Sequence, residues 1–129
     1  GEGNYYLEIQ SNGLEEQRSV NQALIKMSEE TGIPLIATND VHFINHSDAR
    51  AQDILMCVQT GKKYNDTQRM RFNTDQVYLR TPEEMAEQFP VRQDALENTV
   101  KIAEMCNVEI TFGRPVLPQF DIPGGLSPA

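Results

Sequence analysis

An apolar run that ends in an Asp-x-His pair is the part of the sequence best suited to chemistry. Residues 33–38 are mostly apolar, and Asp40 and His42 follow directly after them. In an extended strand, residues two apart point the same way, so this carboxylate and this imidazole can converge on one ion while Val41 turns toward the core. The two groups suit zinc, manganese or iron, and such an ion can activate water to attack phosphorus. The pair predicts part of a metallo-hydrolase site.

The pair cannot complete such a site alone, because a hydrolytic metal centre takes three or more protein ligands. The chain contains only two histidines, so the other ligands must come from elsewhere. A plainer interpretation stays open, in which Asp40 caps the following turn and His42 donates a hydrogen bond to the backbone.

Two further polar residues lie close to this region in the sequence. Glu8, near the end of an earlier predicted strand, could be a base or a hydrogen-bond partner of a metal ligand, although a glutamate on a polar strand face is more often simply solvated. His46 follows the site loop and could touch substrate, against the more frequent case of a loop histidine near a helix N-terminus. Both roles are hypotheses that the pattern alone does not decide.

The elements before the pair predict a βαβ unit. Residues 4–10 alternate between apolar and polar side chains, residues 14–31 carry an apolar stripe of Val20, Leu24 and Met27, and Gly32 is placed to end that helix. The uninterrupted run 33–38 predicts a strand covered on both faces. Such units pair their strands in parallel, and sites lie beyond the carboxyl ends of parallel strands. Asp40 and His42 stand at that end.

The middle of the chain predicts a helix and then a loop. The helix covers residues 47–60, with Ser47 as its N-cap, Gly61 as its stop and one apolar face that holds Ala51, Ile54, Leu55 and Val58. The loop, residues 62–74, carries the only basic cluster of the chain: Lys62, Lys63, Arg69 and Arg71. Either this is a solvated surface loop or it contacts nucleic acid or an acidic neighbouring domain.

The last third predicts short elements and a tail. Residues 76–79 suggest a short strand, Thr81-Pro82-Glu83-Glu84 is a capping box that begins a helix ending at Phe89, and residues 93–106 form a second helix that buries Leu96, Val100 and Ala103. Residues 108–112 alternate as a strand. Residues 114–129 are rich in proline and glycine, which favours an extended linker.

Composition narrows the function classes. The net charge of −8 argues against this chain gripping phosphate backbones by itself. Cys57 and Cys106 fall on apolar helical stripes and are expected to be buried, reduced thiols. With no bilayer-length apolar run, no signal peptide and an opening Gly1-Glu2-Gly3, we expect a soluble, cytoplasmic piece of a longer protein.

An ordered series of segments runs from about Asn4 to Gly125. The segments are Tyr6-Leu7-Glu8-Ile9-Gln10, Pro34 to His42, Asp53 to Lys62, Met70-Arg71-Phe72, Tyr78 to Met85, Ala95 to Thr99 and Leu117-Pro118-Gln119-Phe120. Together they resemble the C family of bacterial replicative DNA polymerases, the alpha subunits of DNA polymerase III. Asn12 and Gln52 depart from it, since many relatives carry histidine there.

The resemblance implies an α/β fold that is a fragment of a distorted, seven-stranded, TIM-like β/α barrel, the polymerase and histidinol phosphatase (PHP) domain. Residues 1–61 would be the C-terminal part of that domain, 62–113 a helical region toward the polymerase core, and 114–129 a Pro/Gly-rich linker. Asp40 and His42 would occupy the last metal-binding motif, for zinc or manganese. The other ligands would lie upstream, and the magnesium-binding polymerase aspartates downstream.

Two functions follow from this resemblance. The first is a part of the DNA-synthesising subunit, a nucleotidyltransferase, in which the PHP region contributes metal ligands to a phosphoesterase site resembling a 3′–5′ exonuclease, the isolated piece being inactive. Its partners would be DNA, deoxynucleotides, other holoenzyme subunits, the rest of the barrel and the palm. The second is a non-catalytic support or docking region for the polymerase core, with a vestigial metal site.

Overall fold

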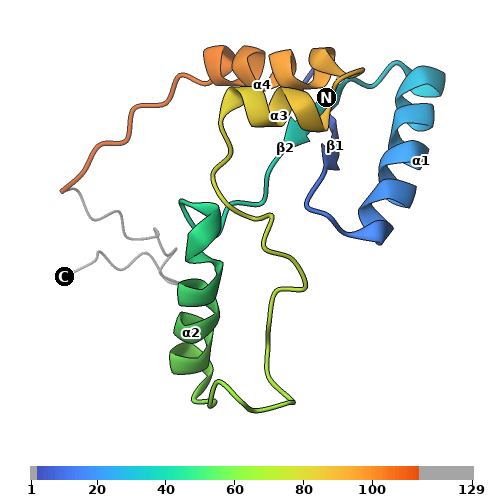
Figure 1. Ribbon diagram of the computed structural model, residues 1–129. Helices are drawn as coiled ribbons and strands as arrows, with labels where there is room; N and C mark the ends of the chain where they lie inside the picture. Colours follow the sequence, from blue (N-terminus) through green and yellow to red (C-terminus); the bar gives the residue numbers. More distant parts are fainter. Residues whose placement is uncertain (1–2, 114–129) are drawn as a thin grey trace, which may run out of the picture.

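The computed structural model describes residues 3–113 and shows a mixed α/β chain (Figure 1). Within that range it contains a two-stranded parallel sheet, four α-helices and one short 3-10 helix. In chain order the elements are β1 (Leu7–Gln10), α1 (Glu15–Thr31), β2 (Leu35–Thr38), η1 (His46–Asp48), α2 (Ala49–Thr60), α3 (Pro82–Gln88) and α4 (Gln93–Met105).

The predicted βαβ unit is confirmed. β1 and β2 pair in parallel, with Leu7 opposite Leu35 and Gln10 opposite Thr38. Helix α1 joins them and ends at Gly32, whose φ of 73° lies in the left-handed region that favours glycine. The stripe on α1 was only partly right: Leu24 packs against the core, but Val20 and Met27 are exposed.

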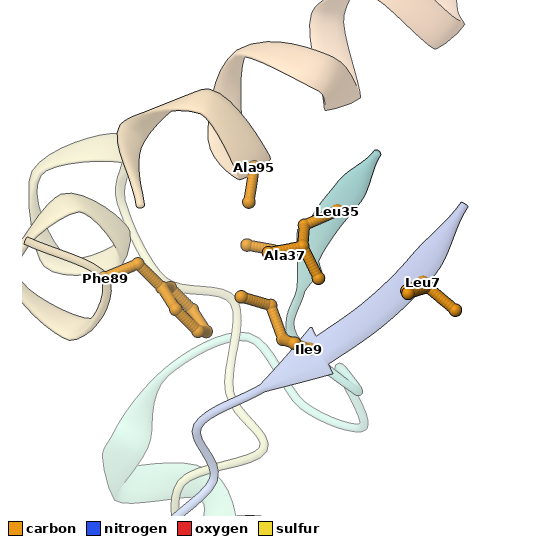
Figure 2. Packing of buried hydrophobic residues seen from close by; sticks show 6 residues of the cluster. All are labelled: Leu7, Ile9, Leu35, Ala37, Phe89 and Ala95. Carbon is orange, nitrogen blue, oxygen red and sulfur yellow. The ribbon is translucent and has the colours of Figure 1, made fainter. Parts of the chain in front are cut away.

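The core is a small apolar cluster between the sheet and the last two helices (Figure 2). Helix α4 packs on β2, and α1 packs on β1. Ile9 of β1 and Leu35 of β2 are almost fully enclosed, and Phe89, at the end of α3, and Ala95, in α4, close the cluster from the other side. The core therefore combines residues of the βαβ unit with residues of the helical region that follows the predicted loop 62–74.

A buried polar residue secures α4 to β2. Asn98 is 8% exposed, and its Nδ2 donates a hydrogen bond of 2.7 Å to the carbonyl of Leu35. The neighbouring carbonyl, of Pro34, accepts from the N–H of Leu7 in β1. Because successive carbonyls of a strand point to opposite sides, the Leu35 carbonyl faces away from β1. Asn98 thus satisfies an edge carbonyl of β2, a role that the sequence pattern did not suggest.

Helix starts and stops agree with local signals in most places. Thr81 accepts from the backbone N–H of Glu84, and the Glu84 carboxylate accepts from the N–H of Thr81, as the capping box predicted. The predicted cap Ser47 was wrong. It lies inside η1, and a box between Asn45 and Asp48 begins that turn instead, since the chain enters α2 through 3-10 geometry.

Helix α2 lies apart from the other helices (Figure 1), and among the described elements only η1 packs against it. Its exposed side chains include Ile54, Leu55 and Val58, so the expected apolar face is not buried in the described chain. The buried residues are Met56 and Cys57, which lie on another side of the helix. Which side chains of α2 are buried therefore depends on the segments that lie beside the helix, and not on the apolar stripe in its sequence.

Three other burial and strand predictions also fail. In α4, Leu96 is partly buried against the core as predicted, but Val100 and Ala103 are exposed, and Ala95 and Asn98 are buried instead. The thiol of Cys57 is buried as expected, but Cys106 is exposed. Residues 108–112 are not a strand, and Val108 and Phe112 are 80% and 87% exposed. An alternating pattern forms a strand only where a partner ladder is available.

The expected strand at 76–79 is reduced to a single parallel bridge between Phe43 and Tyr78. The predicted loop 62–74 contains no helix or strand. The predicted linker 114–129 lies outside the described residues. Across residues 3–113, no helix combines the length and apolar character that crossing a bilayer requires. The coarse α/β class is therefore shown, while the seven-stranded barrel stays a prediction.

We predict that Asn98→Leu destabilises the chain by about 1–3 kcal/mol, because an edge carbonyl of β2 loses its buried donor while side-chain volume is nearly kept. Urea denaturation followed by circular dichroism measures the change. Asn107→Leu, at an exposed position beyond α4, is the matched control and should change stability by less than about 0.5 kcal/mol. Equal effects of the two variants would contradict the role of Asn98.

Candidate metal site

Asp40 and His42 lie just beyond the carboxyl end of β2, side by side. The strand itself ends at Thr38, and Val41 beyond it is 46% exposed and not buried in the core as expected. His42 is held by its backbone N–H, which donates 2.7 Å to the carbonyl of Val77. Its Nδ1 lies 3.8 Å from the Asp40 Oδ1, and both side chains are partly exposed.

The hydrogen bond of the imidazole decides which nitrogen is available. His42 Nδ1 lies 2.9 Å from the backbone carbonyl oxygen of Asp40. A carbonyl only accepts, so Nδ1 carries the proton, and in the neutral ring Nε2 keeps its lone pair. Metal-binding histidines commonly donate their other ring N–H to a carbonyl in this way. Nε2 is therefore the ring nitrogen open to a divalent cation, while the Asp40 carboxylate lies near Nδ1, and both donor types suit zinc or manganese.

The segment after β2 is flanked by residues from far along the chain. Phe43 forms its bridge with Tyr78, the N–H of Leu79 donates to the Phe43 carbonyl, and the side chain of Asn39 donates to the Tyr78 carbonyl. This pairing places Phe72 against His42, with ring centroids 4.4 Å apart. Sequence reasoning did not assign Phe72 to the site, and no spacing pattern could have placed it there.

Glu8 belongs to a polar network across the sheet. Its carboxylate accepts from the hydroxyl of Thr38, which in turn accepts from Nε2 of Gln10 at 3.1 Å. The network joins the facing residues at the carboxyl ends of β1 and β2. These contacts give Glu8 a structural use, and its suggested role at a metal site stays a hypothesis.

His46 is paired with an acidic residue of the long loop. Its Nε2 lies 3.0 Å from Asp75 Oδ2, and its ring meets the edge of Tyr78 at 5.2 Å between centroids. The hydrogen bond from the Gln76 amide lowers the pKa of Asp75, and the charge of His46 lowers it further. Substrate contact by His46 stays a prediction, and its position beside Tyr78 keeps it near the segment after β2.

The basic cluster divides into buried and exposed members. Arg69 makes two hydrogen bonds to the carboxylate of Asp53, of 2.5 and 2.6 Å, and only 1% of its side chain is exposed. Arg71 donates to the carbonyls of Tyr64 and Asp66 within the loop. Lys62 and Lys63 are exposed. Arg69 thus serves to hold the loop on α2, and a contact of Lys62, Lys63 or Arg71 with nucleic acid or another domain stays a prediction.

The ion pair between Asp53 and Arg69 shifts the pKa of both groups. Hydrogen bonding to Arg69 lowers the pKa of Asp53, against a smaller opposing effect of burial, and the positive charge of Arg71 adds to the lowering. The same pairing raises the pKa of Arg69. The loop is therefore fastened to α2 by an ion pair that stays ionised at neutral pH.

Among the described residues, Asp40 and His42 are the candidate metal ligands that lie close together. Within residues 3–113, no group of three or more His, Cys, Asp or Glu side chains could hold a metal ion. Asp40 and His42 would hold an ion only together with ligands from outside this range.

The relatives of the chain share one name. It is 48% identical to the DNA polymerase III subunit alpha of Borreliella burgdorferi over 92% of its length, and 45% identical to that of Treponema pallidum over 95%. The chain is homologous to a segment of DNA polymerase III alpha subunits. The Thermus aquaticus subunit is 37% identical over 97% of the chain. No protein-family model matches.

The homology covers a small part of each relative. The chain spans about one tenth of the length of the alpha subunits of Borreliella burgdorferi and Treponema pallidum. It therefore corresponds to one region of a much longer type of polypeptide.

We predict that Asp53→Asn loosens loop 62–74 at neutral pH, because Arg69 loses its carboxylate. Hydrogen–deuterium exchange of that loop should speed up, while exchange in α4 stays unchanged. The lowered pKa means that Asp53 stabilises the fold above its unfolded pKa of about 4 and loses this effect as the pH falls through its folded pKa. The difference between variant and parent should therefore shrink below about pH 4.

Asp66→Asn is a control that removes a carboxylate without removing the partner of Arg69, since the Asp66 carboxylate accepts from the N–H of Lys63. A difference between Asp53→Asn and parent that is unchanged between neutral pH and pH 3 would contradict the assignment.

Proposed function

We propose that this chain is part of the DNA-synthesising alpha subunit of a bacterial DNA polymerase III and that Asp40 and His42 are two ligands of a PHP-type phosphoesterase site. The observation that carries the proposal is the placement of this pair beyond the carboxyl end of β2, in a chain 48% identical to an alpha subunit. The site would resemble a 3′–5′ exonuclease, and the complete subunit would be a DNA-directed DNA polymerase.

The residues of the chain have defined tasks in this proposal. Asp40 offers a carboxylate oxygen and His42 its Nε2, and the carbonyl of Asp40 and the backbone of Val77 orient the imidazole. A zinc or manganese ion held there would supply an activated water for attack on a phosphodiester. Glu8 and His46 lie on the segments that flank the pair. The magnesium ions of DNA synthesis would bind outside this chain.

The partners follow from the same assignment. Through the complete subunit the chain would work with DNA, deoxynucleotides and other subunits of the holoenzyme in the bacterial cytoplasm, and it would contact the rest of the barrel and the palm. The exposed apolar side chains of Leu55, Val58 and Met70 favour a covering neighbour of this kind.

That same exposure favours the second candidate, a non-catalytic support. If α2 and its loop serve to hold the polymerase core or a docking partner, the metal pair would be a remnant. The two candidates differ in whether the complete subunit binds metal through Asp40 and His42.

We predict that the double variant Asp40→Ala/His42→Ala removes metal from the complete subunit. Zinc and manganese per polypeptide, measured by inductively coupled plasma mass spectrometry, should fall by about one ion, because the remaining ligands lose two donors. His46→Ala is the matched control, since this second histidine is paired with Asp75 and should leave the metal content unchanged. Unchanged metal in the double variant would refute the ligand assignment and favour the support.

We also predict that the isolated 129-residue chain hydrolyses no phosphodiester and binds zinc or manganese weakly, because two ligands alone leave most of the coordination sphere to water. Isothermal titration with each metal measures the affinity. Stoichiometric binding below micromolar concentrations would contradict the expectation that the remaining ligands lie elsewhere.

A further inference from the structure

A hollow beside Phe72, whose ring contacts His42, has a lining suited to a flat aromatic ligand. It lies between the start of α2 and the loop that follows the basic cluster, and it is lined by residues that include Phe43, Ala49, Phe72, Asn73, Thr74 and Asp75. Its volume is about 430 Å³, within the range of small-molecule sites. We propose that this hollow binds a nucleobase by stacking on Phe72. This proposal rests on the proposed function, because the base would belong to the substrate of that site.

Phe72 connects the hollow to the metal pair. Its ring contacts the imidazole of His42 at 4.4 Å between centroids and an interplanar angle of 57°. The residue remains 36% exposed, so part of the ring is free to meet a ligand. His42 itself is fixed by the carbonyls of Asp40 and Val77. A base on Phe72 would therefore lie on a ring that itself contacts His42.

The walls of the hollow combine apolar faces with polar edges. Phe43, half-buried and held by its bridge to Tyr78, contributes a second aromatic side chain, and Ala49 adds a small apolar one. Asn73 is exposed and carries both an amide donor and a carbonyl acceptor. Nucleobases match this lining, because their faces stack on aromatic rings and their edges form hydrogen bonds.

The charges around the hollow permit an anionic ligand. Its two carboxylates are engaged elsewhere: Asp53 with Arg69, and Asp75 with His46 and Gln76. A phosphate attached to the base would therefore meet carboxylates that already have partners. A free apolar ligand would make no use of this arrangement.

The test uses the 129-residue chain and 2′-deoxyadenosine 5′-monophosphate in EDTA, followed by backbone amide shifts in two-dimensional NMR. Shifts are expected at Phe43 and at residues 72–75, and not in α4. Deoxyribose 5-phosphate, which lacks the base, should leave these amides in place. The Phe72→Leu variant should bind the nucleotide about tenfold more weakly, since one stacking contact is lost.

Two variants separate stacking from general damage. Phe112→Leu is the matched control, because Phe112 is 87% exposed and distant in sequence, and it should keep the parent affinity. Phe72→Tyr keeps an aromatic ring and should bind as the parent does, which keeps the test decisive if Phe72→Leu fails to fold. Equal shifts with deoxyribose 5-phosphate, parent affinity in a folded Phe72→Leu variant, or weak binding by Phe72→Tyr would overturn the proposal.

The EDTA condition keeps this test independent of the metal site. Nucleotide binding through Phe72 together with unchanged metal in Asp40→Ala/His42→Ala would reject the phosphoesterase alone. Metal loss in that variant without nucleotide binding in the chain would reject the base site alone.

Discussion

The parallel pairing of β1 and β2 under α4 is the contact on which the rest of the chain depends. Ile9 and Leu35 lose nearly all their exposure there, and burial of such side chains is the main favourable term in folding. The pairing also sets the place where both strands end, and Asp40 and His42 follow one of these ends. Stability of the core and position of the candidate ligands thus come from the same two strands.

The same core explains how distant parts of the chain reach the site. Phe89 and Ala95 enter the cluster, which anchors α3 and α4, and Asn98 satisfies an edge carbonyl of β2 from the same helix. Arg80 is also buried, and its guanidinium donates to the Ser11 carbonyl just after β1. Because these contacts hold α3 and α4 against the sheet and Arg80 against the segment after β1, the loop that leads to α3 passes the end of β2. Phe43 and Tyr78 form their bridge there, and Phe72 contacts His42.

Helix α2 is stabilised in a different way. It has little contact with the core, and the ion pair between Asp53 and Arg69 fastens loop 62–74 to it, while Met56 and Cys57 are buried. An outward face that includes Leu55 and Val58 is left uncovered. The described chain thus has two parts. The βαβ unit packs with α3 and α4 into a small core, and α2 projects from it together with loop 62–74. The apolar surface of α2 is suited to contact with another part of a larger protein.

Local signals in the sequence were sufficient where the structure depends on a few adjacent residues. The capping box at Thr81, the left-handed stops at Gly32 and Gly61, and the βαβ order all follow from backbone preferences and short periodicity. The position of Asp40 and His42 just past a buried parallel strand belongs to the same class, because it needs only the order of elements. Only the tertiary structure decided which apolar faces are buried, as on α2 and around Val100, and that residues 108–112 lack a strand partner. It also decided that Arg69 pairs with Asp53, that Ser47 is not the cap, and that Phe72 lies against His42. These outcomes depend on contacts between residues far apart in the chain, which a sequence pattern read in one dimension does not contain.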